Sequence, residues 1–280
     1  MAYKTIAVHL DDGKHCKSRV DVAADIARRF DAHLIGVYSA PAIMGAHALQ
    51  DPWLGERLTA RSDEAATRVE AVSSQFLTRA GGLDSTRVEF RSEDMGPVEA
   101  MKTHARYSDL IVIGQTDPDQ RVAGVPANFP ELVTLTAGRP VLVVPYYTDA
   151  FPKLGAKVLV AWNANREATR AVTDAMPFLQ RAQRVTVMTV NSKHDRGENR
   201  DVPAAGIAHY LARHGVKAEA AQSYSDELTV GDELLVRVAD GEIDLLVMGA
   251  YGHSRLREIV LGGVTQTLLQ HMTVPILMSH

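Results

Sequence analysis

The sequence predicts an α/β protein built from two tandem doubly wound domains, each a parallel sheet covered by helices. Two observations predict this class: apolar runs alternate with segments of helical periodicity, and the pattern occurs twice along the 280 residues. In the second half the runs VLVAW, VTVMTV, DLLVMGA and VPILMS are separated by stretches such as REATRAVTDAMPFL. Runs that are apolar on both faces indicate a parallel sheet between two helical layers, with Rossmann-like crossover connections.

The repeat is clearest around the fourth strand expected in each half. Residues 105–115 (ARYSDLIVIGQ) resemble residues 239–250 (ADGEIDLLVMGA), with Gly114 opposite Gly249. A repeat of this size indicates that each half is one complete structural unit.

A stretch containing proline and glycine, PYYTDAFPKLG (145–155), separates the halves. We therefore expect one domain in residues 1–150 and a second in residues 151–280. The first half has extra residues, which we expect in the segment 41–58, where turn residues interrupt the pattern. Such a long connection is typically a functional lid or a packing arm.

Composition excludes several classes of function. The chain has 34 acidic and 30 basic residues, a net charge of -4, which argues against a nucleic-acid partner. Its single cysteine, Cys16, excludes an intramolecular disulfide framework and fits a reducing compartment. The first apolar run ends at Asp11, which is too short for a signal-peptide core or a membrane span. We therefore expect a cytoplasmic protein with no membrane partner.

Ligands of doubly wound sheets bind at the carboxyl ends of the strands, near the topological switch point, so the site should follow the first and fourth strands. After the fourth strand of the second half the sequence reads G-x-x-G-(nine)-G-G-x-T, formed by Gly249, Gly252, Gly262, Gly263, Val264 and Thr265. Glycine lets backbone N–H groups approach an anion closely, and the helix expected in VTQTLLQHM begins with N–H groups that attract phosphate. The pattern predicts a phosphate cradle, to which the Thr265 hydroxyl adds a donor. The alternative is that these glycines only shape two loops.

This motif resembles the one that ATP-binding members of the universal stress protein family carry after the fourth strand, G-x-x-G-(nine)-G-S/T. The resemblance covers nearly all of the chain and implies a tandem two-domain member. Gly263 departs from the pattern, because it stands where the family often has Ser or Thr. The family also places an Asp near the adenine after the first strand, where this chain has Asn163 in the second half and Asp11 in the first. The alternative role of Asn163 is to cap the helix that begins near Arg166.

Further candidates surround the motif. His253, Ser254, Arg255 and Arg257 lie in the nine-residue loop, and Arg166 follows the first strand of this half; each faces phosphate or is a solvated surface residue. Trp162 borders an adenine or packs between sheet and helix. The residues predicted to bind the nucleotide are Ala161, Trp162, Asn163, Gly249, Gly252, His253, Arg255, Gly262, Gly263, Val264 and Thr265.

The first half departs much further from the motif. Opposite Gly252, Gly262 and Gly263 it has Asp117, Ala127 and Asn128, in a loop with three prolines. The carboxylates of Asp117 and Asp119 would repel a phosphate. We predict that the first half does not bind ATP by this loop, and a different ligand there remains open.

The resemblance implies a stress-response protein that binds an adenine nucleotide, ATP with or without Mg²⁺, in the second domain. Binding would order the segment from Gly249 to Thr265, and the other domain or a protein partner would respond to this conformational change. In the family, single domains dimerise, so the tandem form implies an intramolecular pseudo-dimer that pairs the strands PVLVV (140–144) and PILM (275–278); further dimerisation is open. The alternatives are a hydrolase or nucleotidyl-transfer enzyme that recruits His253 or Asp11, and a scaffold without nucleotide. No residue is identifiable as a catalytic base, so ATP hydrolysis would be slow at most, and no zinc, P-loop or nucleophile-elbow motif is present.

Overall fold

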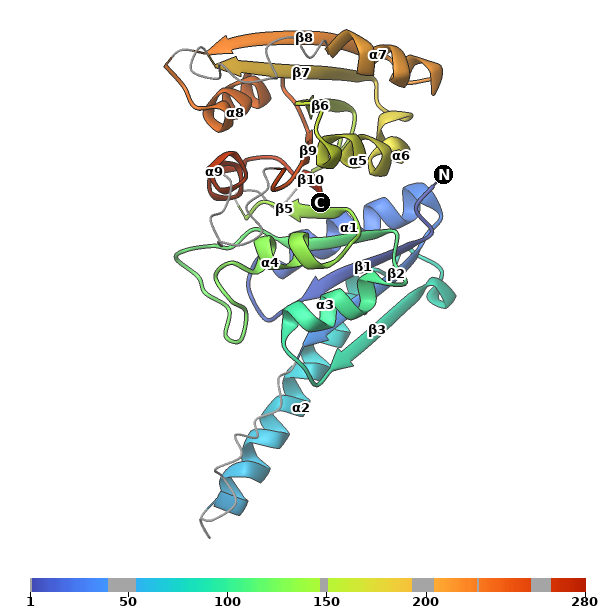
Figure 1. The fold of residues 1–280 in the computed structure, drawn as a ribbon. Helices are drawn as coiled ribbons and strands as arrows, with labels where there is room; N and C mark the ends of the chain where they lie inside the picture. The colour runs from blue at the N-terminus through green and yellow to red at the C-terminus, as the bar shows by residue number, and fades with distance from the viewer. Residues whose placement is uncertain (1, 40–53, 147–150, 193–203, 226, 253–262) are drawn as a thin grey trace.

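The computed structural model describes residues 2–39, 54–146, 151–192, 204–225, 227–252 and 263–280. Its strands form one ten-stranded sheet in the order β3-β2-β1-β4-β5-β10-β9-β6-β7-β8 (Figure 1). The strands are β1 (Thr5–Leu10), β2 (His33–Ser39), β3 (Val88–Glu93), β4 (Leu110–Gly114), β5 (Val141–Val144), β6 (Lys157–Ala161), β7 (Arg184–Ser192), β8 (Ala218–Ser225), β9 (Leu245–Gly249) and β10 (Ile276–Ser279).

Each half contributes five parallel strands in the same order, β3-β2-β1-β4-β5 and β8-β7-β6-β9-β10. The two sets meet where β5 and β10 pair antiparallel, with Leu142 opposite Leu277. The predicted pairing of these two strands is therefore confirmed, as is the doubly wound α/β fold. Because the join is antiparallel, the strands of the two halves run in opposite directions.

Helices cover both faces of the sheet, as the apolar strands require. They are α1 (Cys16–Phe30), α2 (Leu54–Arg79), α3 (Pro97–Ala105), α4 (Phe129–Thr136), α5 (Arg166–Asp174), α6 (Met176–Leu179), α7 (Ala204–Arg213), α8 (Val230–Asp240) and α9 (Gly263–His271), with a short 3₁₀ turn at Ser85–Arg87. Successive side chains of β1 alternate between the two layers: Ile6 and Val8 pack into the core beneath α1 and α5, and Ala7 packs into the core beneath α3 and α9.

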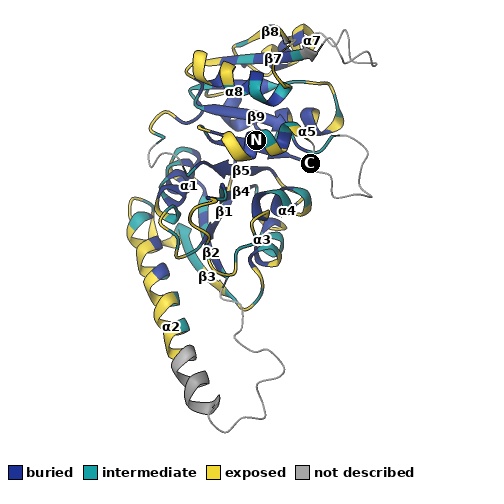
Figure 2. Ribbon diagram, turned by 90° about the vertical axis from the view of Figure 1, so that its left-hand side faces the viewer, coloured by how far each residue is buried: buried dark blue, intermediate teal, exposed yellow. Residues whose placement is uncertain are grey.

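Helix α2 is the main departure of the first half from the second. It has 26 residues, whereas its counterpart α7 has 10. Val72 and Phe76, near its C-terminal end, are buried in the core. The helix extends away from the sheet as an arm, and most of residues 63–71 on it are exposed (Figures 1 and 2). The extra length expected in the segment 41–58 is therefore partly helical, and residues 41–53 of that segment lie outside the described residues.

Aromatic packing also joins the halves beside the β5–β10 pair. Tyr3 contacts the rings of both Phe30 and Phe178, at centroid separations of 5.2 and 5.6 Å. Its hydroxyl donates a hydrogen bond to the backbone oxygen of Asp174 at 2.7 Å. The interface is thus formed by buried side chains as well as by backbone pairing. Among the described residues, no helix is long and apolar enough to cross a membrane.

Candidate functional site

Each half brings the ends of its first and fourth strands together. β1 lies beside β4 and β6 lies beside β9, and both pairs are parallel. The sheet continues from these pairs in opposite directions, so the two carboxyl-terminal edges are topological switch points, where doubly wound proteins bind ligands. The first and fourth strands of each half, after which the site was expected, are therefore neighbours.

In the second half, Gly249 and Gly252 lie against the beginning of α5. A Cβ atom on Gly249 would stand 2.4 Å from the backbone nitrogen of Ala168 and 2.5 Å from the carbonyl carbon of Glu167. A Cβ atom on Gly252 would stand 1.8 Å from Nδ2 of Asn165. Both distances are well inside van der Waals contact. At position 249 a larger residue would displace the backbone of the first turn of α5, and at position 252 it would displace the Asn165 side chain. Close backbone packing therefore requires glycine at position 249.

Asn165 caps α5, so the alternative role of Asn163 as that cap is wrong. Oδ1 of Asn165 accepts a hydrogen bond from the N–H of Ala168 at 2.7 Å, the geometry of a helix N-cap. Asn163 stands two residues earlier, and its Oδ1 accepts a 3.3 Å hydrogen bond from the N–H of Asn165. Asn163 is exposed at the edge of the sheet and steadies the turn rather than the helix.

The remaining predicted residues lie along this edge. Ala161 ends β6 and is half-buried, and Trp162 packs, also half-buried, against the core beneath α5. Packing is therefore one role of Trp162. Gly263 begins α9 and is exposed with open space around it, whereas Val264 is half-buried and Thr265 is 3% exposed. The accessible residue of this turn is thus Gly263. The predicted residues His253, Arg255 and Gly262, with Ser254 and Arg257, lie outside the described residues.

A buried carboxylate accompanies the second-half glycines. Glu167 is 6% exposed, and its Oε2 would lie 3.0 Å from a Cβ on Gly252. Arg166 neutralises it, with Nη2 at 2.9 Å from Oε1, while the rest of the Arg166 side chain is solvated. Within the described ranges, no three His, Cys, Asp or Glu side chains gather as a metal site would require. A Mg²⁺ ion at this edge would need oxygen ligands from phosphate besides Glu167.

The first half has a cavity of about 460 Å³ at the corresponding edge. It lies between the turn that joins β1 to α1 and the loop that joins β4 to α4. The turn and the loop touch, because a Cβ on Gly13 would be 2.8 Å from Cγ2 of Val122. Thr116 closes the base of the loop by donating a 2.9 Å hydrogen bond to the backbone oxygen of Ala127. The cavity is therefore bounded by ordered, mutually braced backbone.

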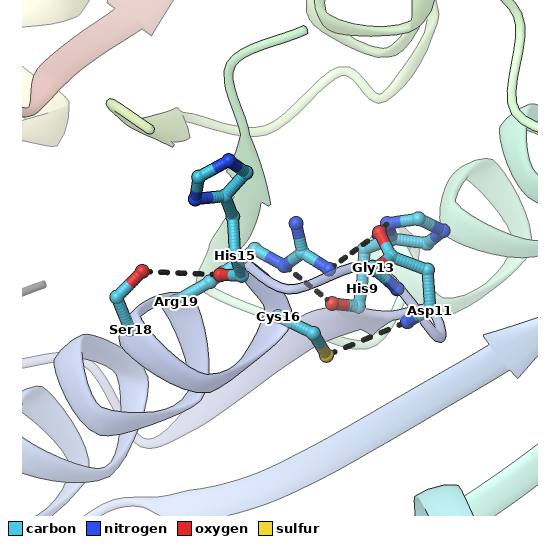
Figure 3. Close-up of polar contacts among 7 residues, drawn as sticks. All are labelled: His9, Asp11, Gly13, His15, Cys16, Ser18 and Arg19. Atoms are coloured by element: carbon cyan, nitrogen blue, oxygen red, sulfur yellow. Dashed lines mark hydrogen bonds and ion pairs between the residues drawn. The ribbon is translucent and has the colours of Figure 1, made fainter. Parts of the chain in front are cut away.

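A buried ion pair forms the floor of this cavity (Figure 3). Nη2 of Arg19 lies 2.7 Å from Oδ2 of Asp11, and their side chains are 5% and 10% exposed. Nε of Arg19 donates to the backbone oxygen of His9 at 2.7 Å, and Oδ1 of Asp11 accepts from the N–H of Gly13 at 2.9 Å. Burial opposes ionisation of Asp11, but the charge of Arg19 and these hydrogen bonds outweigh it and lower the Asp11 pKa. Both members of the pair are thus charged, and both make further hydrogen bonds to the backbone.

His9 lies beside this pair and is neutral. Burial, reinforced by the Arg19 charge, lowers its pKa to about 3, although Asp11 opposes the shift. The 3.6 Å separation between Nδ1 of His9 and Oδ2 of Asp11 is therefore not an ion pair at neutral pH. Burial also raises the pKa of the nearby Cys16 thiol, so this cysteine stays protonated.

The predicted acidic character of the first-half loop is visible in the cavity wall. Asp117 is 7% exposed, and its Oδ2 lies 2.9 Å from Nε2 of His15 and 3.8 Å from Nζ of Lys14. Its other oxygen accepts from the N–H of Asp119. Burial would raise the Asp117 pKa, but the hydrogen bonds and the neighbouring positive charges lower it overall. A fixed negative charge therefore stands at the position that corresponds to Gly252.

Sequence reasoning did not identify His9 and Arg19. His9 is a polar residue inside the otherwise apolar run TIAVHL, next to the strand end. Arg19 shares the helical stripe of Ala23, Ile26 and Phe30, all of which are buried. A charged residue on an apolar stripe signals a buried partner, and Asp11 was available at the end of the preceding strand.

Buried polar groups link each site to the opposite half. Gln115, next to β4, donates through Nε2 to the backbone oxygens of Leu269 and Gln270, at 2.9 and 3.2 Å. These carbonyls belong to the last turn of α9, which begins at Gly263. Tyr251, between those glycines, has a pKa raised by burial and by the charge of Glu131 on α4. The first-half edge therefore contacts α9 of the second half, and the charge of Glu131 on α4 influences Tyr251 at the second-half edge.

Fold and site define the class as a tandem doubly wound α/β protein with its candidate sites at two switch points. Residues 156–280 match the model of the universal stress protein family. A universal stress protein of Synechocystis sp. is 24% identical over 227 residues, which are 79% of this chain and 75% of that protein. The resemblance to this family is thus confirmed, and residues 156–280 match it directly.

Two solved structures resemble the full chain in fold. A universal stress protein from Archaeoglobus fulgidus has a TM-score of 0.69 at 13% identity, over 98% of this chain and 97% of its own. A Pseudomonas aeruginosa protein described as functionally unknown has a TM-score of 0.61 at 14% identity, over 99% of this chain and 92% of its own. At these identities the likeness concerns the fold alone, and it extends over both halves.

Proposed function

We propose that the second half binds an adenine nucleotide, ATP with Mg²⁺, at the edge formed by β6, β9 and the beginning of α9. One observation carries the proposal: the motif glycines Gly249 and Gly252 stand at the switch point, and Gly263 opens α9 with nothing within 4 Å of the place where a Cβ atom would stand. Exposed backbone at a helix start suits phosphate, because the first N–H groups of a helix have no partner within it.

The binding mode follows from the residues around this edge. Asn163 is exposed and offers an amide that both donates and accepts, which suits the edge of a base. Glu167, the buried carboxylate beside Gly252, supplies one oxygen ligand for Mg²⁺ while the phosphates supply others. Nucleotide would favour whichever arrangement of the loop and α9 it binds more tightly. Gln115 holds the last turn of α9, so such a change would reach the first half.

The test uses a substitution that the structure can accommodate. Gly252→Asp would confound loss of binding with a clash against Asn165, whereas Gly263→Asp places a carboxylate in open space at the start of α9. Gly206→Asp is the matched control, because Gly206 is exposed on α7 and also has open space around it. Mass spectrometry of the denatured protein would identify bound nucleotide, and calorimetric titration with ATP and Mg²⁺ would measure affinity.

We expect ATP to bind the wild type and Gly206→Asp equally and to bind Gly263→Asp much more weakly. Gly263→Ser should bind about tenfold more tightly, equivalent to about 1.4 kcal/mol, because it adds a hydroxyl donor for phosphate. If neither the wild type nor Gly263→Ser binds any nucleotide, the proposal is wrong and the scaffold interpretation gains support. Turnover of ATP that tracks occupancy across these variants would favour the enzyme interpretation instead.

A further inference from the structure

The first-half cavity has the construction of a ligand site that differs from the second-half glycine loop. Its volume of about 460 Å³ is within the range typical of small-molecule sites. Val122, Val125 and Phe129 give it an apolar wall, and the ion pair of Asp11 and Arg19 gives it a polar floor. Phe129 is 2% exposed and packs against the ring of His9 at a centroid separation of 4.5 Å. Such a combination suits a ligand with both apolar and polar surfaces.

One polar atom of the cavity has no partner. His9 is 2% exposed, and its Nδ1 makes no hydrogen bond to any of the described residues. The nearest carboxylate oxygen, Oδ2 of Asp11, lies 3.6 Å from Nδ1, which is beyond hydrogen-bond distance. A buried polar atom without a partner costs about 1–3 kcal/mol, so native proteins rarely leave one without a purpose. Because His9 lines the cavity, a ligand group that reaches its ring would supply the missing partner.

The charges around the cavity balance. Its lining contains three lysine or arginine side chains, three carboxylates and two histidines, of which His9 is neutral and His15 is paired with Asp117. The lysine, arginine and aspartate residues are Asp11, Asp12, Lys14, Arg19, Asp117 and Arg121. The guanidinium of Arg19 covers the end of β4, because a Cβ on Gly114 would be 2.4 Å from Nη1. That guanidinium is neutralised by Asp11 at 2.7 Å, so it offers no net charge to an anion. The cavity consequently gives no electrostatic preference to a phosphate, and Asp117 opposes one.

We propose that the first-half cavity binds an uncharged, polyhydroxylated ring, with one ligand hydroxyl on Nδ1 of His9. A hydroxyl both donates and accepts, so it satisfies either tautomer of the imidazole. The C–H face of such a ring suits the apolar wall, and its other hydroxyls suit the paired carboxylates and guanidinium groups. A free sugar and the ribose of an unphosphorylated nucleoside are the two sources of this chemistry. The site is independent of the nucleotide proposed for the second half.

The experiment uses the full-length protein and matched probes. A panel of neutral mono- and disaccharides, together with adenosine, is compared with glucose 6-phosphate and AMP by ligand-observed NMR and calorimetric titration. Ala127→Trp obstructs the cavity from an exposed position of its lining, and His9→Phe removes the nitrogen while keeping a ring. Tyr107→Trp is the control for a new exposed indole, since Tyr107 is 79% exposed and outside the cavity. Gly263→Asp separates binding in the second half from binding in the first.

We expect at least one neutral probe to bind, with its phosphorylated counterpart about tenfold weaker or worse. Binding should persist in Tyr107→Trp and Gly263→Asp, disappear in Ala127→Trp, and weaken about tenfold in His9→Phe. Sugar binding would identify a free sugar as the source, and binding of adenosine alone would identify ribose. The proposal is overturned if no neutral probe binds, if the phosphorylated members bind equally well, or if binding survives Ala127→Trp. Because Ala127 is exposed, that variant tests the site even if His9→Phe fails to fold.

Discussion

Replacing Arg19 with Met should strongly destabilise the first half. The side chains of Arg19 and Asp11 are 5% and 10% exposed, and their charged atoms lie 2.7 Å apart. Removing one member of a buried pair leaves the other charge without compensation, at a cost of about 3–5 kcal/mol. Arg19→Met combined with Asp11→Asn should cost less than the two single substitutions together, because the double variant leaves neither charge behind.

Urea denaturation would measure these free energies of unfolding, with the transitions by circular dichroism and by fluorescence required to coincide. The matched control is Arg28→Met on the same helix, where the pair of Arg28 and Asp25 is 3.9 Å apart with both side chains nearly half exposed. That substitution should change stability by no more than about 0.5 kcal/mol.

The cost of Arg19→Met should also depend on pH. The folded state lowers the Asp11 pKa, so the stability supplied by the pair is present above the unfolded pKa of about 3.9 and is lost as pH falls through the folded pKa. The deficit of the variant should therefore be largest near neutral pH and shrink toward pH 4 and below, as Asp11 becomes protonated. A deficit of less than about 1 kcal/mol at neutral pH, unchanged by acid, would show that the pair behaves as a solvated one and refute the reasoning.

Three further outcomes follow from the contacts above. Gly249→Ala should lower the free energy of unfolding by about 1–3 kcal/mol or more, seen as a drop in Tm, because the new Cβ would meet the backbone of Ala168 at 2.4 Å; an unchanged Tm would contradict this close packing. Asn165→Ala should cost about 1 kcal/mol by chemical denaturation while Asn163→Ala costs little, and the reverse order would move the cap back to Asn163. His9 has a folded pKa of about 3, below its ordinary value of about 6.5. The stability that neutral His9 supplies is therefore present above pH 6.5 and is lost by up to about 1.4 kcal/mol per pH unit as the pH falls toward 3. His9→Phe should flatten that part of the plot of unfolding free energy against pH, and an unaltered plot would argue against a buried neutral His9.

The fold could be predicted from the sequence because its signals are local and repeated. Apolar runs on both strand faces specify a covered parallel sheet, and the duplicated pattern specifies two of them. The matched terminal strands also indicated the pairing of β5 with β10. The length of α2 was harder to predict, because a polar arm has no apolar face to mark its extent.

The candidate sites were less accessible to sequence reasoning because they depend on residues far apart in the chain. The glycine motif predicted the position of the second-half edge, because a glycine in the sequence marks a place where the backbone itself needs a residue without a Cβ atom. The cap was misassigned by two residues because Asn163 and Asn165 are equally suited by type, and only the backbone geometry selects between them. The first-half cavity joins His15 to Asp117 across the fold, a pairing that no local spacing encodes.

The antiparallel join between β5 and β10 has a consequence for how the two halves can diverge. In an assembly of separate identical subunits, every substitution appears in both copies, and the assembled fraction falls when the protein is dilute. Here the partner is covalently attached, so the effective concentration of one half around the other is set by the chain and survives dilution. One edge can therefore keep its glycines while the other acquires an ion pair and a neutral histidine, and each molecule carries one copy of each edge at any protein concentration.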